Sequence, residues 1–414
     1  MSDQLGEEAR TVLNQAAREH RGFPEIAWFV KGMERAFQEE TLSAGKPGLI
    51  IVGEDFPPEL ALAVCGRPRF LLGGSLVTTH WSDALLPRDA DPVSRSLCGW
   101  LLNDHFDLAR QSLVVMTLTN DNRRKLAGLL RARGVSVLTV DMPPRCHTDA
   151  DRSAWAEEML RAYDEMAARM KVRPSYRRLV QAMEETRRLR RGILSFQNAA
   201  LKAPGCMSPA LRGIILESVW YAEDRNAWLE HLNSLTGRIT AWQKRYYQKD
   251  DGRPWVLSIG SPIIFPNEKL PLLLDDCRLF LAGRVDALSV QTRMRMPKPR
   301  RWGTVKELLL RQARERMPRE TSGAWTVNQG LLDAVRSRLE RQDIDGIVFH
   351  VLKGQIEYDF ELPRVERIAA EYGVPVFRLE TDYQRQDVEQ LRIRMEAFSE
   401  MLRQRGGERM RLAQ

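Results

Sequence analysis

Two apolar runs in this chain are each followed almost at once by a side-chain amide. Residues 112–118 (SLVVMTL) are followed by Thr and Asn120, and residues 346–352 (GIVFHVL) by Lys, Gly and Gln355. A side-chain amide donates and accepts hydrogen bonds but carries no charge. The chemistry expected of these two residues is therefore binding and positioning of a polar group.

Both runs have the composition of buried β-strands. Each is rich in β-branched residues and is followed by polar turn residues, by a helical pattern and by a Gly-Val pair, at 134–135 and at 373–374, that opens another strand. This order is typical of a β-α-β unit in a parallel sheet. Ligands of open parallel sheets bind beyond the carboxyl ends of the strands. We therefore predict two such units, with Asn120 and Gln355 in the working crevice.

Several further segments carry a distinctive pattern. They are LPRDADPVSR (86–95), TND (119–121), DGIVFHVLKG (345–354), LETDY (379–383), EQLR (389–392) and RMEAF (394–398). Together they resemble the large-subunit family of 2-hydroxyacyl-CoA dehydratases and ATP-dependent benzoyl-CoA reductases, and the resemblance extends over most of the chain.

The chain departs from that family at the positions that would hold an iron-sulfur cluster. The family has cysteines before the proline of the first motif, before the aspartate of the second and after Lys-Gly of the third. Here these positions are Asp91, Asn120 and Gln355. Iron-sulfur clusters depend on thiolate ligands, for which an amide oxygen is a poor replacement. We therefore expect this chain to bind no cluster and no other metal.

The resemblance also implies partners and a substrate class. Enzymes of the family are heterodimers of two related subunits, each usually with a cluster, and a separate ATP-hydrolysing activator supplies an electron of low potential. The electron reaches a CoA thioester, after which hydroxide leaves the neighbouring carbon or an aromatic ring is reduced. For this chain the resemblance implies a cluster-bearing partner subunit, an activator protein and an acyl-CoA substrate.

Three roles remain open for a chain without cluster ligands. It is the cluster-free half of a heterodimer that shapes the acyl-CoA site, or a cluster-independent acyl-CoA enzyme, or a non-catalytic scaffold or binding protein derived from the family. We take the first as the working hypothesis. It predicts that Asp91, Asn120 and Gln355 line a polar, substrate-binding cavity.

Four residues are candidates for the chemistry of that cavity. Glu59 resembles the family's Pro-x-Glu segment near the thioester, and Ser261 follows a predicted strand and faces the same crevice, unless it caps the segment after it. Asp91 and Asp121 would form a carboxylate pair for proton transfer. The alternative for Asp121 is that it caps a helix beginning at Asn122.

Composition places the chain among ordinary globular proteins. Its 414 residues are 43% hydrophobic and 29% charged. The net charge of +8 comes largely from arginine in residues 171–191 and 293–319 and attracts anions in general. We find no nucleic-acid-binding module, no apolar run long enough to span a membrane and no secretory signal, and expect a cytoplasmic protein. The basic loop 293–301 is either a docking segment or a solvated insertion.

The sequence lacks the motifs of several other enzyme classes. No Walker lysine motif, G-x-G-x-x-G, H-E-x-x-H or G-x-S-x-G is present, so ATP hydrolysis, dinucleotide binding, zinc proteolysis and serine hydrolysis are not indicated. The 5 cysteines form no C-x-x-C pair, which argues against disulfides and structural zinc. Cys98, seven residues after Asp91, would be a single thiolate without the companions that a cluster needs.

The predicted fold is α/β, with two Rossmann-like parallel sheets joined by a helical region. N-terminal helices occupy residues 1–48, the first α/β domain 49–148, the helical region 149–250 and the second α/β domain, with a C-terminal helix, 251–414. In the second domain we place strands at 254–260, 285–290, 346–352 and 374–379. Three tryptophans of the helical region (Trp220, Trp228 and Trp242) are expected in the core or at a subunit contact.

Overall fold

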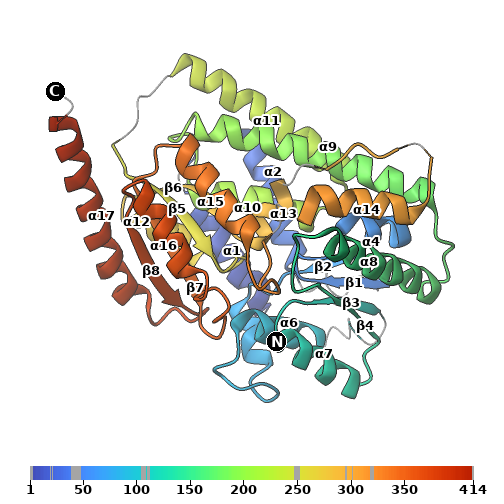
Figure 1. Ribbon diagram of the computed structural model, residues 1–414. Coiled ribbons are helices and arrows are strands. Elements are labelled where there is room, and N and C mark those ends of the chain that lie inside the picture. Colours follow the sequence, from blue (N-terminus) through green and yellow to red (C-terminus); the bar gives the residue numbers. More distant parts are fainter. Residues whose placement is uncertain are drawn as a thin grey trace.

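The computed structural model describes residues 3–412 apart from 19, 21, 39–47, 104–108, 110–111, 247–251, 294–295, 301 and 318–320. Figure 1 shows two sheets at either side of the molecule with helices around and between them. The α/β class, with two parallel sheets, a helical middle and N-terminal helices, is confirmed.

The first sheet contains four parallel strands in the order β2-β1-β3-β4. Its strands are β1 (Leu49–Val52), β2 (Arg69–Leu71), β3 (Leu113–Leu118) and β4 (Val137–Asp141). Every residue of β1 and β3 is buried, as expected where helices cover both faces of a parallel sheet. The helices of this half are α4 (Pro58–Cys65), α5 (Leu76–Trp81), α6 (Pro92–Leu101) and α7 (Asp121–Ala132).

The second sheet repeats this topology, in the order β6-β5-β7-β8. Its strands are β5 (Trp255–Gly260), β6 (Phe280–Val285), β7 (Gly346–Leu352) and β8 (Val376–Thr381). Its helices are α12 (Lys269–Asp276), α13 (Ala287–Arg293), α14 (Val305–Arg316), α15 (Gln329–Arg341), α16 (Leu362–Glu371) and α17 (Val388–Leu412). The first strand of each sheet in chain order, β1 or β5, has a neighbouring strand on both sides. Its carboxyl end therefore lies between the ends of two other strands.

One predicted strand is wrong. Residues 285–290 contain only the last residue of β6, and α13 begins at Ala287. The Asp286 carboxylate accepts a hydrogen bond from Ser289 N at 2.8 Å, which is how a side chain caps a helix. This cap outweighs the alternating apolar pattern that suggested a strand.

Long helices separate the two sheets. They are α1 (Gln4–Ala16), α2 (Pro24–Ala36), α8 (Asp149–Arg169), α9 (Tyr176–Leu201), α10 (Pro209–Glu217), the short η1 (Ser218–Trp220) and α11 (Arg225–Arg245). Thr148 and Asp151 form a capping box that starts α8. Trp220 and Trp228 are buried in the main core, and Trp242 packs against it, as predicted.

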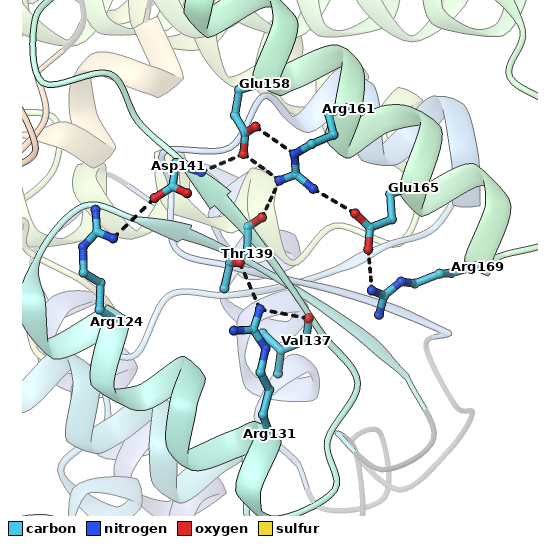
Figure 2. Close-up of polar contacts among 9 residues, drawn as sticks. All are labelled: Arg124, Arg131, Val137, Thr139, Asp141, Glu158, Arg161, Glu165 and Arg169. Atoms are coloured by element: carbon cyan, nitrogen blue, oxygen red, sulfur yellow. Dashed lines mark hydrogen bonds and ion pairs between the residues drawn. The ribbon is translucent and has the colours of Figure 1, made fainter.

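The exposed edge of the first sheet is covered by charged side chains (Figure 2). Arg161 of α8 donates from Nη2 to the carbonyl oxygen of Thr139 at 2.7 Å, and Glu158 accepts from Asp141 N at 2.9 Å. From the other side, Arg131 of α7 donates to the Thr139 hydroxyl at 2.9 Å. These contacts occupy backbone groups through which an edge strand would otherwise pair with another chain.

Two further expectations concern surfaces. Of the basic loop 293–301, the structure describes Arg293 as the end of α13 and residues 296–300, where Met296 and Pro299 are buried and Lys298 and Arg300 are exposed; residues 294, 295 and 301 lie outside the described residues. Within the described chain, no helix combines the length and apolarity needed to cross a membrane.

Candidate functional site

The carboxyl ends of the two sheets face each other around one small cavity. We call it the strand-end cavity; its volume is about 20 Å³, room for roughly one water molecule. It is lined by Glu54, Asp55, Asp91, Val93, Thr119, Asn120, Arg123, Pro262, Ala287, Gly323, Gln355, Glu357 and Tyr358. The structure thus brings together all three residues that stand where the family has cysteines.

Asp91 and Gln355 join the two halves of the molecule. Asp91 caps α6, and its two carboxylate oxygens accept from Val93 N and Ser94 N at 3.0 Å each. Gln355 Nε2, from the turn after β7, donates to Asp91 Oδ1 at 2.8 Å. The turn approaches so closely that a Cβ on Gly354, whose φ is +85°, would lie 2.9 Å from Asp91 N. Only glycine fits this position without strain.

Asn120 makes a second connection between the halves. Its Oδ1 accepts from Arg123 N at 2.9 Å and so caps α7. Its Nδ2 donates to Glu357 Oε1 at 3.1 Å. Burial raises the pKa of Glu357, while the Asn120 hydrogen bond opposes that rise. The carboxyl of Glu357 is therefore held at the cavity with a greater tendency to carry a proton than an exposed glutamate has.

A buried ion cluster lies beside these amides. Arg123 of α7 donates to Asp55 Oδ2 at 2.8 Å, and its Nη2 lies 3.4 Å from Glu54 Oε2. Burial and the neighbouring Asp55 raise the pKa of Glu54 to about 7, against the opposing effect of Arg123. A Cβ on Gly53 would lie 2.5 Å from Arg123 Nη1, so the guanidinium packs directly on the chain that follows β1.

The donor set at the cavity does not fit an iron-sulfur cluster. Asp91 and Asn120 use their side-chain atoms to cap helices and to bind Gln355 and Glu357. Gln355 Oε1 is buried without a hydrogen-bond partner among the described residues, yet an amide oxygen is a poor ligand for cluster iron. Among the described residues, no three His, Cys, Asp or Glu side chains are grouped so as to hold a metal ion. Cys98 is buried within α6 and does not line the cavity.

Ser261 fastens strands together and does not line the cavity. Its hydroxyl accepts from Leu352 N at 2.9 Å, and its backbone N donates to the carbonyl oxygen of His350 at 2.8 Å. It does not cap the segment after it. His350 Nδ1 lies 3.0 Å from the carbonyl oxygen of Ser261, and burial lowers its pKa to about 4. His350 is thus a neutral core residue at neutral pH.

Glu59 lies behind the cavity wall. It is 0% exposed on α4, where Gln312 of α14 donates to its Oε1 and Arg316 Nη1 lies 3.9 Å from the same atom. Arg316 Nη2 also donates to the carbonyl oxygen of Asp55 at 3.2 Å. Glu59 therefore reaches the cavity only through Arg316, and its catalytic role stays a prediction.

Asp121 does not join Asp91. It is exposed at the first position of α7 and is not part of the cavity lining, so the two do not form the carboxylate pair considered from the sequence. The capping alternative is also off by one residue, because the cap is Asn120 and the helix begins at Asp121. The extended backbone of Asn120 lets its side-chain oxygen accept a hydrogen bond from Arg123 N.

Most of the ionisable residues of the site were not predicted from the sequence. Glu54, Asp55, Arg123, Glu357 and Tyr358 all line the cavity. A signal for the first two was present, because they closely follow the apolar run Leu49–Val52, and the rule that ligands bind beyond strand ends, applied to that run, finds them. Arg123 lacked such a signal, since one arginine among several at a helix start is usually exposed.

Comparisons with known proteins identify the family of this chain. The chain is 26% identical over 353 residues to the putative dehydratase subunit YjiM of Escherichia coli (strain K12), covering 84% of this chain and 89% of that protein. It is 25% identical over 213 residues to the (R)-phenyllactyl-CoA dehydratase beta subunit of Clostridium sporogenes, covering 51% of this chain and 54% of that protein. The model of the 2-hydroxyglutaryl-CoA dehydratase D-component family matches residues 55–402. The chain belongs to this family.

Proposed function

We propose that this chain is the cluster-free subunit of a 2-hydroxyacyl-CoA dehydratase-like complex. It shapes the acyl-CoA site, while a related partner subunit carries the iron-sulfur cluster and an ATP-dependent activator supplies the electron. The observation that carries this proposal is the meeting of Asp91, Asn120 and Gln355 at one cavity, each engaged with side chains of this chain. The relatives named as subunits support a division of labour between two chains.

A surface beside the cavity supports partner binding. Ile356 and Phe360, on the turn after β7, are 66% and 75% exposed, and they flank the cavity residues Glu357 and Tyr358. Large apolar side chains gathered at the surface often mark protein contacts. We place the cluster-bearing subunit on this turn, so that its cluster lies near the strand-end cavity.

The alternative of a cluster-independent enzyme has one observation in its favour. Glu54, whose pKa is raised to about 7, lines the cavity together with Glu357, whose pKa burial also raises. A carboxyl group that titrates near neutral pH, as Glu54 does, suits general acid-base catalysis. Turnover of an acyl-CoA by this chain alone, in air and without iron, would favour this alternative.

The test is anaerobic co-purification of the tagged chain with a related subunit from its host, with iron and sulfide determined in the product. We expect an iron-containing heterodimer in which the separated chain holds no iron. F360D should abolish the complex, whereas I393D, at a residue on α17 that is 69% exposed, should leave it intact. A brown, iron-containing product from this chain alone would refute the proposal.

A further inference from the structure

A second, larger cavity lies at the β6 edge of the second sheet, next to the helical region. Its volume is about 760 Å³, within the range typical of ligand sites. It lies between α9, α10, β6, α13 and α15. Four arginines line it, namely Arg212, Arg284, Arg338 and Arg341. We call it the arginine pocket.

The four guanidinium groups of this pocket differ in their partners. Arg212 is buried, donates to the carbonyl oxygen of Leu281 and lies 5.2 Å from the centre of the Phe280 ring. The guanidinium groups of Arg338 and Arg341 form no hydrogen bond or ion pair with the residues that the structure describes. Burial, helped by Arg284 and Arg338, lowers the pKa of Arg212 to about 10, so it is still charged at neutral pH.

The one acidic residue in the lining does not cancel this charge. Glu217 accepts from Phe265 N at 2.9 Å through Oε1. Burial and the neighbouring Glu268 raise its pKa well above the usual value, against the opposing effect of Arg284. Arg212 is buried, Arg284 and Arg338 are half-buried and Arg341 is exposed, so guanidinium groups of like charge, which disfavour one another, meet at a pocket that an anion from solvent can enter. The pocket therefore calls for a ligand with several negative charges.

The other residues of the lining indicate what the uncharged part of such a ligand should be like. Leu194, Leu201, Leu216 and Leu288 offer apolar surface, and other polar groups come from Gln197, Asn198, Ser289 and Ser337. Guanidinium groups bind phosphate through paired hydrogen bonds. A ligand with several phosphate groups and a partly apolar remainder would contact both the arginines and the leucines.

We propose that the arginine pocket binds the phosphorylated nucleotide end of coenzyme A, an inference that rests on the acyl-CoA role proposed above. Helix α13 gives the two sites a common wall, because Ala287 lines the strand-end cavity and Leu288, Ser289 and Val290 line the arginine pocket.

The experiment is calorimetric titration of the full chain with CoA, dephospho-CoA, adenosine 3′,5′-bisphosphate and inorganic phosphate. We expect CoA and the bisphosphate to bind, and each of R338Q and R341Q to weaken both by about tenfold, the effect of one charge-assisted hydrogen bond. Dephospho-CoA should bind more weakly than CoA. R341Q removes an exposed side chain, so its fold should be intact by circular dichroism.

The matched control is R336Q on the same helix. Arg336 is 43% exposed and pairs with Glu371 at 2.5 Å, and it does not line the pocket; its loss should leave CoA affinity unchanged. The proposal is overturned if CoA does not bind, if R338Q and R341Q bind it as tightly as the original chain, or if inorganic phosphate alone binds as tightly as the nucleotide.

This result is separable from the test of the proposed function. If a complex with R338Q and R341Q converts its acyl-CoA normally, the proposal that the arginine pocket binds CoA is refuted, while the proposed heterodimer is not. Conversely, arginine-dependent CoA binding by a chain that recruits no cluster-bearing partner would uphold the pocket and refute the division of labour.

Discussion

The two sheets share one strand order but differ in the residues at the carboxyl ends of their strands. After β1 and β3 of the first sheet come Glu54, Asp55 and Arg123, which form a buried ion cluster. After β5 and β7 of the second sheet come Ser261 and Gln355, whose polar atoms form neutral hydrogen bonds or bind Asp91 across the cavity. The two sheets therefore have the same topology but place different kinds of side chain at their strand ends.

The difference shows how the molecule accommodates the three replaced positions. The charges of the first sheet are compensated within that half, through Arg123, and need nothing from the second. The amides at positions 120 and 355 instead reach across, to Glu357 and Asp91. Asp91 and Gln355 bind each other and Asn120 binds Glu357, so the site is a junction between the two halves.

The largest effect is expected at the ion cluster. R123M leaves the buried Glu54 and Asp55 without their cation, and breaking a buried pair in this way destabilises by about 3–5 kcal/mol. The measurement is urea unfolding monitored by circular dichroism. R124M is the control on the same helix, because Arg124 is 53% exposed in a 3.4 Å pair with Asp141; a comparable loss there would show that the cluster is not what matters.

The next effect tests the junction from the second sheet. In G354A the new Cβ meets Asp91 N, and alanine must adopt a φ of +85°. Backbone strain of this kind costs roughly 1–3 kcal/mol, and the contact adds to it. G128A is the opposite control, because Gly128 lies inside α7 with no atom within 4 Å of its Cβ position, and it should stabilise by about 0.5–1 kcal/mol. Equal melting shifts for the two variants would contradict the close approach.

Much of the fold was predictable because it depends on local patterns. The runs at 112–118 and 346–352 were buried strands, and the Gly-Val pairs preceded β4 and β8. The strand predicted at 285–290 failed because a single side-chain cap at Asp286 decided between two conformations that the apolar pattern allows equally. Local hydrogen bonds of this kind compete with periodicity and are hard to read from sequence.

The site was predictable to the extent that strand ends define it. Asn120, Gln355 and Asp91 converge as the motifs indicated, although they are far apart in the chain. Glu59 was chosen for its resemblance to the family's Pro-x-Glu segment and Asp121 as a carboxylate within the second motif, and the structure buries the first behind the cavity and exposes the second at the surface. Which way a side chain points within one helical turn depends on tertiary packing, which a motif does not encode.

A smaller effect is expected where the second sheet is fastened. S261A removes the acceptor of Leu352 N, and a buried amide left unpaired costs about 1–2 kcal/mol. S136A removes an exposed hydroxyl that accepts from Arg169 at 3.0 Å and should change the free energy of unfolding by less than about 0.5 kcal/mol. If S261A were as harmless as S136A, the hydroxyl would not be what holds the carboxyl end of β7.

The smallest effect at neutral pH, but the most specific, concerns Glu54. Its pKa is raised from 4.5 to about 7 in the folded chain, so the folded state binds a proton that the unfolded state has released between these values. Stability should therefore be undiminished by this group below pH 4.5 and should fall as pH rises from about 4.5 to about 7. E54Q cannot ionise, so its unfolding free energy should decline less over that interval, while D121N, at an exposed position, should keep the original slope. Parallel pH profiles for E54Q and the original chain would mean that Arg123 holds Glu54 fully ionised, and that the ion cluster of the first sheet carries no titratable proton.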